Sequence, residues 1–277
     1  MFLIGTLYFG LVGAVVGSFL NVVVGRLPAG ESVVRPRSRC PRCGTQIAWY
    51  DNIPIISWIV LRAKCRSCKA PISARYPMVE LLMGCIGAAS YVQLGLTWQM
   101  LVWFPIAAGL LAITFLDIDH WWVPDVITYP LMVWAAAGAF VPDGIGWLAA
   151  LLGLVPAAFL WLVAFAFEKL TKREGLGFGD IKLLALMGLL LGPLGAMTAL
   201  FFAAVQGAIV GLIVMATGGH RSAQPPQPAD DGWVPHPRAI PFGPFLALAT
   251  YEMVLAPEFF AQVPWRISMA LAPLLQR

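Results

Sequence analysis

Apolar segments of helical length recur along most of this sequence. They cover residues 3–24, 77–96, 98–117, 124–141, 146–167, 181–192, 194–216 and 240–256. A helix needs roughly 20 mainly apolar residues to cross the hydrocarbon of a bilayer. Only 12% of the residues are charged, whereas soluble domains carry about 25%. We therefore predict an all-α polytopic membrane protein with about eight transmembrane helices, rather than a large soluble core.

The first and sixth segments are the least regular of the set. The first lacks a basic N-terminal region and is too long for a signal-peptide core, so we predict a retained span. The sixth, 181–192, is short for a crossing. We expect it to start at Asp180, to be tilted, or to be broken at Gly192-Pro193.

The basic residues predict the orientation of the chain. If the N-terminus is outside, every Lys and Arg except Arg266 and Arg277 falls on the cytoplasmic side, as positive charges do in membrane proteins. The polar segment 217–238 is predicted to be flexible because it is rich in Pro, Gln, Asp and Gly. The tail after Ala256 is predicted to lie at the membrane interface.

Four of the five cysteines form two CxxC pairs, Cys40 with Cys43 and Cys65 with Cys68. Two such pairs supply the four thiolates of a closed tetrahedral zinc site, which is structural because no ligand position is left for water. The alternative is two disulfides, which are rare in the cytosol. We predict a first transmembrane helix at 1–25, a zinc-binding cytoplasmic loop domain at 26–76 and a transmembrane domain at 77–277. Cys85, inside the second span, is predicted to be a packing residue.

Four carboxylates from two distant stretches are predicted to share one membrane depth. Asp117 and Asp119 end the third span, Asp125 begins the fourth, and Asp180 begins the sixth. An acid at a helix start is explained by capping and by the helix dipole. That explanation serves for Asp125 and Asp180, but it fails for Asp117 and Asp119 at a helix end.

Two explanations remain open for the acids at the end of the third span. They pair with Lys182 or Arg173, or they belong to a shared catalytic site. Two carboxylates held close together do not both ionise easily, so one keeps a proton. Such a pair can activate a water molecule and polarise a peptide carbonyl. The three histidines offer no competing nucleophilic triad: His120, His220 and His236.

Several polar residues inside apolar segments invite a structural explanation. Asn21 is expected to bond a neighbouring helix, and Glu80 is expected to cap the second span. Glu252 lies in the eighth span without an obvious partner. Residues 240–245, with two prolines around a glycine, predict a re-entrant or broken helix start.

Several motifs together resemble the GxGD-type aspartic prepilin peptidases of bacteria. The stretch Gly177-Phe178-Gly179-Asp180, with Asp117 and Val123-Pro124-Asp125 before it, looks like their catalytic motifs. Residues 17–28 and 240–245 match their N-terminal and C-terminal stretches. The two CxxC pairs match the zinc loop of the full-length, bifunctional members. The resemblance covers most of the chain.

The resemblance implies a specific activity. Members of this family cleave short basic leaders from type IV prepilins and type II secretion pseudopilins at the cytoplasmic face of the bacterial inner membrane. They then N-methylate the new N-terminal residue with S-adenosylmethionine. The implied catalytic pair is Asp117 and Asp180, with Asp119 and Asp125 accessory and with Gly177 and Gly179 in the GxGD motif. The residues that bind S-adenosylmethionine stay unassigned, and no nucleic-acid partner is expected.

Three other functions compete with this interpretation. A proton- or metal-coupled transporter with a zinc-binding regulatory loop would place its carboxylates near the bilayer midplane. An assembly factor would use the acids structurally, and a peptidase without methyl transfer would use only the aspartate pair. The basic loop is expected to face lipid phosphate rather than the basic leader. Neutralising Arg35, Arg37 and Arg39 together tests this hypothesis.

Overall fold

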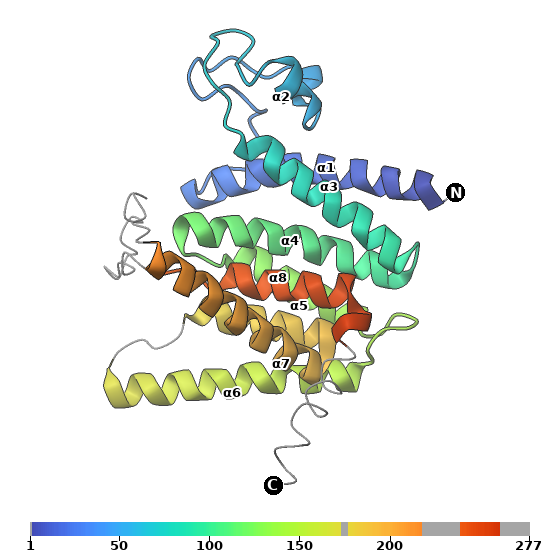
Figure 1. Ribbon diagram of the computed structural model, residues 1–277, viewed down its shortest axis with the longest axis vertical. Helices are drawn as coiled ribbons and strands as arrows, with labels where there is room; N and C mark the ends of the chain where they lie inside the picture. Colours follow the sequence, from blue (N-terminus) through green and yellow to red (C-terminus); the bar gives the residue numbers. More distant parts are fainter. Residues whose placement is uncertain (1, 173–176, 218–238, 261–277) are drawn as a thin grey trace.

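The computed structural model describes residues 2–172, 177–217 and 239–260 (Figure 1). The regular secondary structure of these residues is helical, and they contain no strand. The predicted loop at 217–238 and the predicted interfacial tail lie outside the described residues, apart from Thr217 and residues 257–260. The pairing partner Arg173 lies outside them as well.

The helices follow one another in a simple order along the chain. They are α1 (Phe2–Arg26), η1 (Leu27–Ala29), η2 (Trp49–Asn52), α2 (Ile56–Val60), α3 (Arg75–Leu94), α4 (Trp98–His120), α5 (Asp125–Gly138), α6 (Trp147–Thr171), α7 (Phe178–Ala216) and α8 (Gly243–Leu255). Five of these are long and apolar enough to cross a membrane: α1, α3, α4, α6 and α7. The structure confirms a polytopic helical architecture, and it has fewer full-length spans than the eight expected.

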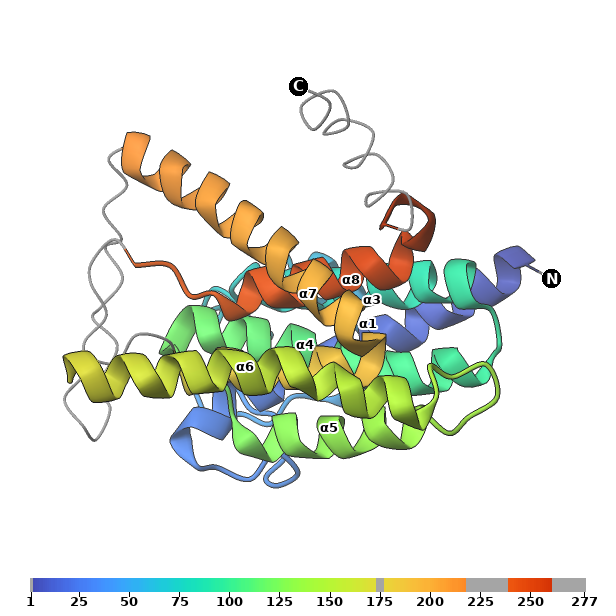
Figure 2. The ribbon, with the colours of Figure 1, turned by 90° about the horizontal axis from the view of Figure 1, so that it is seen from below.

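Helix α7 explains part of this difference, because two of the predicted segments form its two halves, on either side of a kink at Gly192, and are counted together. It runs continuously in sequence from Phe178 to Ala216, with Gly192 alone out of helical conformation at φ 75° and ψ −179°. Pro193 lacks an N–H and disfavours the helical conformation of the residue before it. The predicted break at Gly192-Pro193 is therefore confirmed as a kink, after which α7 diverges from α6 (Figure 2).

Helix α4 lies at the centre of the bundle, between the α1–α3 pair and the layer of α5, α7 and α8 (Figure 1). Its residues Trp103, Ile106 and Leu110 are almost fully buried, and they belong to one core with Leu183 of α7 and Leu246 of α8. The outward sides of α1 and α6 expose large apolar residues, as expected for helices in contact with lipid tails. The polar ends of α4 and α7 are therefore held by the best-packed part of the molecule.

Backbone contacts between small residues bring the helices of this bundle close together. Gly153 of α6 and Gly188 of α7 face each other, and a Cβ added at either glycine would overlap the carbonyl oxygen of the other. Gly17 of α1 likewise lies against α3, where an added Cβ would be 2.8 Å from the Cα of Glu80. Helices pack in lipid by such close backbone approach, because apolar side chains gain little from leaving lipid.

We predict that Gly188→Ala destabilises the protein by about 1–3 kcal/mol, because the new methyl group forces α6 away from α7. Thermal unfolding of the purified protein in detergent measures this change. The matched control is Gly211→Ala on the same helix, where no atom lies within 4 Å of an added Cβ. The control is expected to leave stability unchanged or slightly raised. Equal stability of the two variants would contradict the packing account.

Candidate functional site

Asp117 is a buried carboxylate in the last turn of α4. Its side chain is 6% exposed, and its Oδ2 accepts a hydrogen bond of 3.1 Å from the backbone N–H of Gly243. A Cβ at Gly243 would lie 2.6 Å from the same oxygen. The first residue of α8 therefore approaches Asp117 closely because it has no side chain. This contact gives the predicted broken helix start at 240–245 a specific partner.

Asp180 lies in the first turn of α7, on the side of that helix that meets α4 and α8. Leu183, one turn later, is fully buried, and its Cδ1 is 3.3 Å from the position of an added Cβ at Gly243. The charges of Asp117 and Asp180 interact electrostatically. The structure thus brings the ends of α4, α7 and α8 together, with both predicted catalytic acids at their meeting point.

The glycines of the GxGD motif allow other atoms to approach this turn. A Cβ at Gly179 would lie 2.8 Å from Cγ2 of Val123, in the connection between α4 and α5. A Cβ at Gly177 would lie 3.6 Å from Oδ2 of Asp180. Gly179 therefore packs the start of α7 against the segment that follows α4, and this packing brings the two acids near each other.

Asp119 and Asp125 each form an ion pair with a basic residue of another helix. Asp119 Oδ2 lies 2.5 Å from Nη2 of Arg75, whose guanidinium also stacks over the ring of Phe115 at 4.9 Å. Lys182 Nζ pairs with Asp125 Oδ1 and donates to the carbonyl of Val123. Of the alternatives left open by the sequence, an ion pair of Lys182 with Asp117 or Asp119 is therefore not the one that the structure has. Sequence reasoning missed Arg75, because such a contact between separate helices leaves no local pattern.

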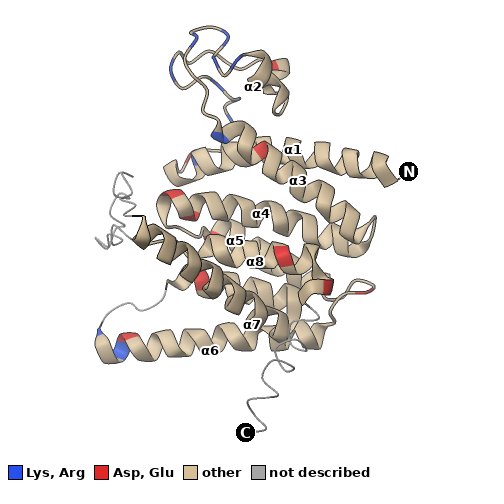
Figure 3. Ribbon diagram, viewed as in Figure 1, with Lys and Arg blue, Asp and Glu red and all other residues tan. Residues whose placement is uncertain are grey.

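The predicted capping role of Asp125 and Asp180 is not what the structure has. The N-cap residues are Pro124 for α5 and Gly177 for α7, and neither helix receives a side-chain cap. Both acids lie just inside their helices, so the positive end of the dipole still favours their charge. All four acids lie at one end of the bundle, where Figure 3 shows acidic residues at the end of α4 and the start of α7.

Three further polar residues have partners that the structure identifies. Asn21 Nδ2 donates to the carbonyl of Tyr76 at 3.1 Å, which confirms the predicted contact between helices. Glu80 does not cap α3, because the N-cap is Ala74. Instead, Glu80 Oε2 accepts from the N–H of Ile55 at 2.7 Å. Glu252 also has a hydrogen-bond partner, since Gln206 Nε2 donates to its Oε2 at 2.6 Å.

The four paired cysteines gather in the loop between α1 and α3. Their Sγ atoms all lie within 4.8 Å of one another, and Sγ of Cys40 and Cys68 are 3.8 Å apart. All four are free thiols in the structure rather than disulfides. A Zn–S bond of about 2.3 Å in tetrahedral geometry implies a sulfur–sulfur distance near 3.8 Å. This donor set can therefore hold a metal ion. Cys85, in contrast, is exposed on α3 and is no packing residue.

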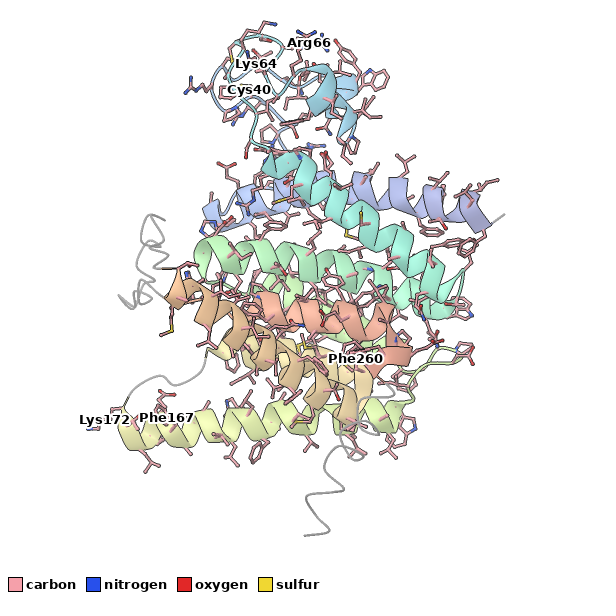
Figure 4. All side chains as sticks on the ribbon, viewed as in Figure 1. Cys40, Lys64, Arg66, Phe167, Lys172 and Phe260 are labelled. Carbon is pink, nitrogen blue, oxygen red and sulfur yellow. The ribbon has the colours of Figure 1, made fainter. Side chains whose placement is uncertain are left out.

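The two CxxC turns have matching backbone bonds. The N–H of Gly44 donates to the carbonyl of Cys40, and the N–H of Lys69 donates to the carbonyl of Cys65. Hydrogen bonding with the side chain and backbone of Thr45 lowers the pKa of Cys43 to about 6. The backbone N–H groups of Cys68 and Ser67 lower the pKa of Cys65. One thiol in each turn therefore favours the thiolate, the form that binds metal. Although a backbone hydrogen bond at Ala70 acts the other way, burial and the three neighbouring cysteines raise the pKa of Cys68 to about 11. Cys40 lies within the loop that projects from α1 and α3 (Figure 4).

An ion pair fixes the second turn to the rest of the loop. Arg66 Nη2 and Nε lie 2.6 and 2.8 Å from the two carboxylate oxygens of Asp51, and the guanidinium stacks on Tyr50 at 5.5 Å. Hydrogen bonding from Arg66 lowers the pKa of Asp51. The cysteine turn is thereby joined to η2, a connection that the sequence did not indicate.

The fold and the site define a class: a polytopic helical membrane protein with two carboxylates, Asp117 and Asp180, at one end of its bundle and a four-cysteine loop. Comparison with known proteins supports this class. Residues 11–94 match the model of the bacterial peptidase A24 N-terminal domain, and residues 104–212 match the model of the type IV leader peptidase family. The chain belongs to the type IV leader peptidase family.

Curated relatives match over nearly the whole length of both chains. A prepilin leader peptidase/N-methyltransferase of Myxococcus xanthus is 37% identical, with 95% of this chain and 94% of the relative covered. Proteins of the same name from Aeromonas hydrophila and Pseudomonas aeruginosa are 35% and 36% identical, covering 90% and 88% of this chain and 91% and 88% of theirs. No solved structure matches. The transporter alternative has no support among these findings.

We predict that Asp125→Asn lowers stability by about 1 kcal/mol, because it leaves the mostly buried ammonium of Lys182 without its carboxylate. Unfolding in detergent measures the change. Asp143→Asn is the matched control, since Asp143 is exposed and has a positive φ of 61° that asparagine tolerates. Stability of both variants equal to that of the wild type would contradict the ion-pair account.

Proposed function

We propose that this chain removes the leader of type IV prepilins and of pseudopilins and then methylates the new N-terminal amine. Family membership and the names of the relatives support the activity. The single observation that carries the assignment of the site is the contact of Gly243 with Asp117 and with Leu183, one turn after Asp180, which joins the helix ends that carry the two acids.

The two aspartates act as a general acid and a general base. The ionised carboxylate takes a proton from a water molecule, and the water oxygen attacks the carbonyl carbon of the scissile peptide bond. The protonated carboxyl group donates its proton to the carbonyl oxygen. The tetrahedral intermediate then collapses and the C–N bond breaks. The released amine takes the proton that the first carboxylate had accepted from water, and the second carboxylate regains its proton from a hydroxyl group of the intermediate. The N–H of Gly243 holds the Asp117 carboxylate in a fixed orientation during these steps.

Asp119 and Asp125 serve as accessory acids that position the site. Asp119 holds Arg75 at the start of α3, and Asp125 holds Lys182 one turn before Leu186 of the α7 core. Each pair fixes the end of another helix near the catalytic acids. Each also balances a basic side chain that would otherwise repel the positive leader.

The site is proposed to face the cytoplasm in a multi-pass inner-membrane protein. Arg26, Arg75 and Lys169 lie at the same helix ends as the acids, which the preference for positive charge inside supports. The short helices α5 and α8 and the two halves of α7 are proposed to complete about eight membrane segments. The bilayer would then present the apolar helix of a prepilin beside the enzyme, with its scissile bond at the interface.

Zinc is the metal proposed for Cys40, Cys43, Cys65 and Cys68. Four thiolates saturate a tetrahedral ion, so the metal would stabilise the loop rather than take part in the reaction. We propose the domain division at 1–25, 26–76 and 77–277 on this basis. The basic residues of the loop are proposed to face lipid phosphate.

S-adenosylmethionine is the proposed methyl donor, and it supplies the methyl group that the new N-terminal amine accepts with loss of a proton. The residues that bind it stay unassigned. A methyl-transfer site separate from the aspartates follows from this proposal, because the aspartate chemistry needs only water and the peptide bond.

We predict that Asp117→Asn and Asp180→Asn each reduce leader cleavage by about 10²–10⁴-fold, since each removes one half of the acid–base pair. The assay uses purified protein in lipid, a prepilin and labelled S-adenosylmethionine. Both variants are expected to methylate pre-cleaved pilin at the wild-type rate. Asp143→Asn, at an exposed position, controls for loss of charge. Cleavage at the wild-type rate by either variant would refute the assignment of the pair.

We predict that Cys40→Ser removes the bound zinc ion from the purified protein, because a tetrahedral site loses one of its four thiolates. Elemental mass spectrometry measures the zinc content per chain. Cys85→Ser is the matched control, since Cys85 lies outside the cluster, and it should retain the full content. Zinc at the wild-type level in the Cys40 variant would exclude this site.

A further inference from the structure

The segment of residues 49–60, which includes η2 and α2, exposes large apolar side chains in the loop between α1 and α3. Trp49 is 73% exposed, Ile59 62% and Val60 68%, and Ile56 is exposed as well. In water such a patch is unusual, and it commonly marks a surface that meets a protein or a membrane. The segment belongs to none of the membrane-spanning helices of the described chain.

The inner side of this segment is fixed by hydrogen bonds. Ser57, which is buried, donates to the carbonyl of Tyr50 and accepts from the N–H of Ile53. Trp58 donates through its indole N–H to the carbonyl of Ile72. The apolar residues on the outer side are therefore displayed by an ordered turn of chain.

A hydrogen bond to a spanning helix gives the depth of the segment. The N–H of Ile55 donates to the Glu80 carboxylate at 2.7 Å, and Ile55 has a positive φ of 62°, which is costly for a β-branched residue. Glu80 lies about 7 Å along the axis of α3 from Arg75, at 1.5 Å per residue. The start of α2 is thus held beside the interior of α3 and not beyond its end.

Helix α1 provides an independent measure of the same depth. The backbone of Glu80 packs against Gly17 of α1. Helix α1 has 25 residues, about 37 Å of helix, whereas the hydrocarbon core is about 30 Å thick, or about 20 residues. A stretch of about 20 residues of α1 that spans the hydrocarbon includes Gly17, whether the stretch begins at Phe2 or ends at Arg26. In Figure 1 the loop that carries α2 projects from the side of the α1–α3 pair that faces away from α4.

We propose that residues 49–60 insert among the acyl chains of one leaflet, beside α1 and α3, and anchor the four-cysteine loop to the membrane. The occupant of the exposed apolar surface is lipid, because the Ile55–Glu80 bond holds this surface at hydrocarbon depth. The Asp51–Arg66 ion pair connects this anchored segment to the second cysteine turn. The loop is thus anchored in the membrane through residues 49–60, and this holds whichever reaction the aspartates catalyse.

The test places one fluorescent amino acid at Ile59, and separately at Val60, in the full-length protein in vesicles of phosphatidylcholine and phosphatidylglycerol. One set of vesicles carries lipids with a nitroxide on the acyl chain, and another is exposed to aqueous iodide. Val34, 76% exposed in the same loop, is the matched control. Leu151, exposed on the spanning helix α6, is the reference for lipid contact.

The probes at Ile59 and Val60 are expected to lose most of their fluorescence to the chain-labelled lipids, as the probe at Leu151 does, and little to iodide. The probe at Val34 should show the reverse. Quenching of both loop probes by iodide would overturn the proposal, because the patch would then face water. Protection from both quenchers would overturn it too, because a protein surface or a second copy would then cover the patch. Thermal unfolding at the wild-type temperature confirms that each labelled protein is folded.

Discussion

The hydrogen bond between the Asp117 carboxylate and the Gly243 N–H is the contact on which the site depends. A buried carboxylate is costly unless a donor compensates for the loss of water. A helix start has free N–H groups, so the beginning of α8 meets this need. The approach requires glycine, because a Cβ would lie 2.6 Å from the carboxylate oxygen. Residues 117 and 243, far apart in sequence, are thereby joined at the end of the bundle.

The same principle of close backbone approach operates through the rest of the molecule. Gly179 brings the start of α7 against Val123, and Gly188 brings its middle against α6. Gly192 and Pro193 then redirect the helix. In an apolar solvent these small residues do what a hydrophobic core does in water, since they bring surfaces close enough for dispersion and polar contacts. The position of Asp180 is a consequence of this packing.

Features that are local in sequence could be predicted before the structure was known. The apolar segments, the kink at Gly192-Pro193 and the two CxxC turns each follow from the residues of one short stretch. The partners of the acids could not be predicted in this way. Lys182 pairs with Asp125, and Arg75 pairs with Asp119, because the packing of whole helices decides which ends meet. Glu80 illustrates the same limit, since its partner Ile55 belongs to the loop.

The central claim is that Asp117 and Asp180 act together on one peptide bond. A prepilin peptide whose scissile bond is replaced by a hydroxyethylene group imitates the tetrahedral intermediate. The most direct measurement is an experimental structure of the protein in lipid with this peptide bound. The account predicts that the hydroxyl group lies within hydrogen-bond distance of both carboxylates, close to Gly243. A bound peptide whose hydroxyl group contacts neither aspartate, or only one of them, would contradict it.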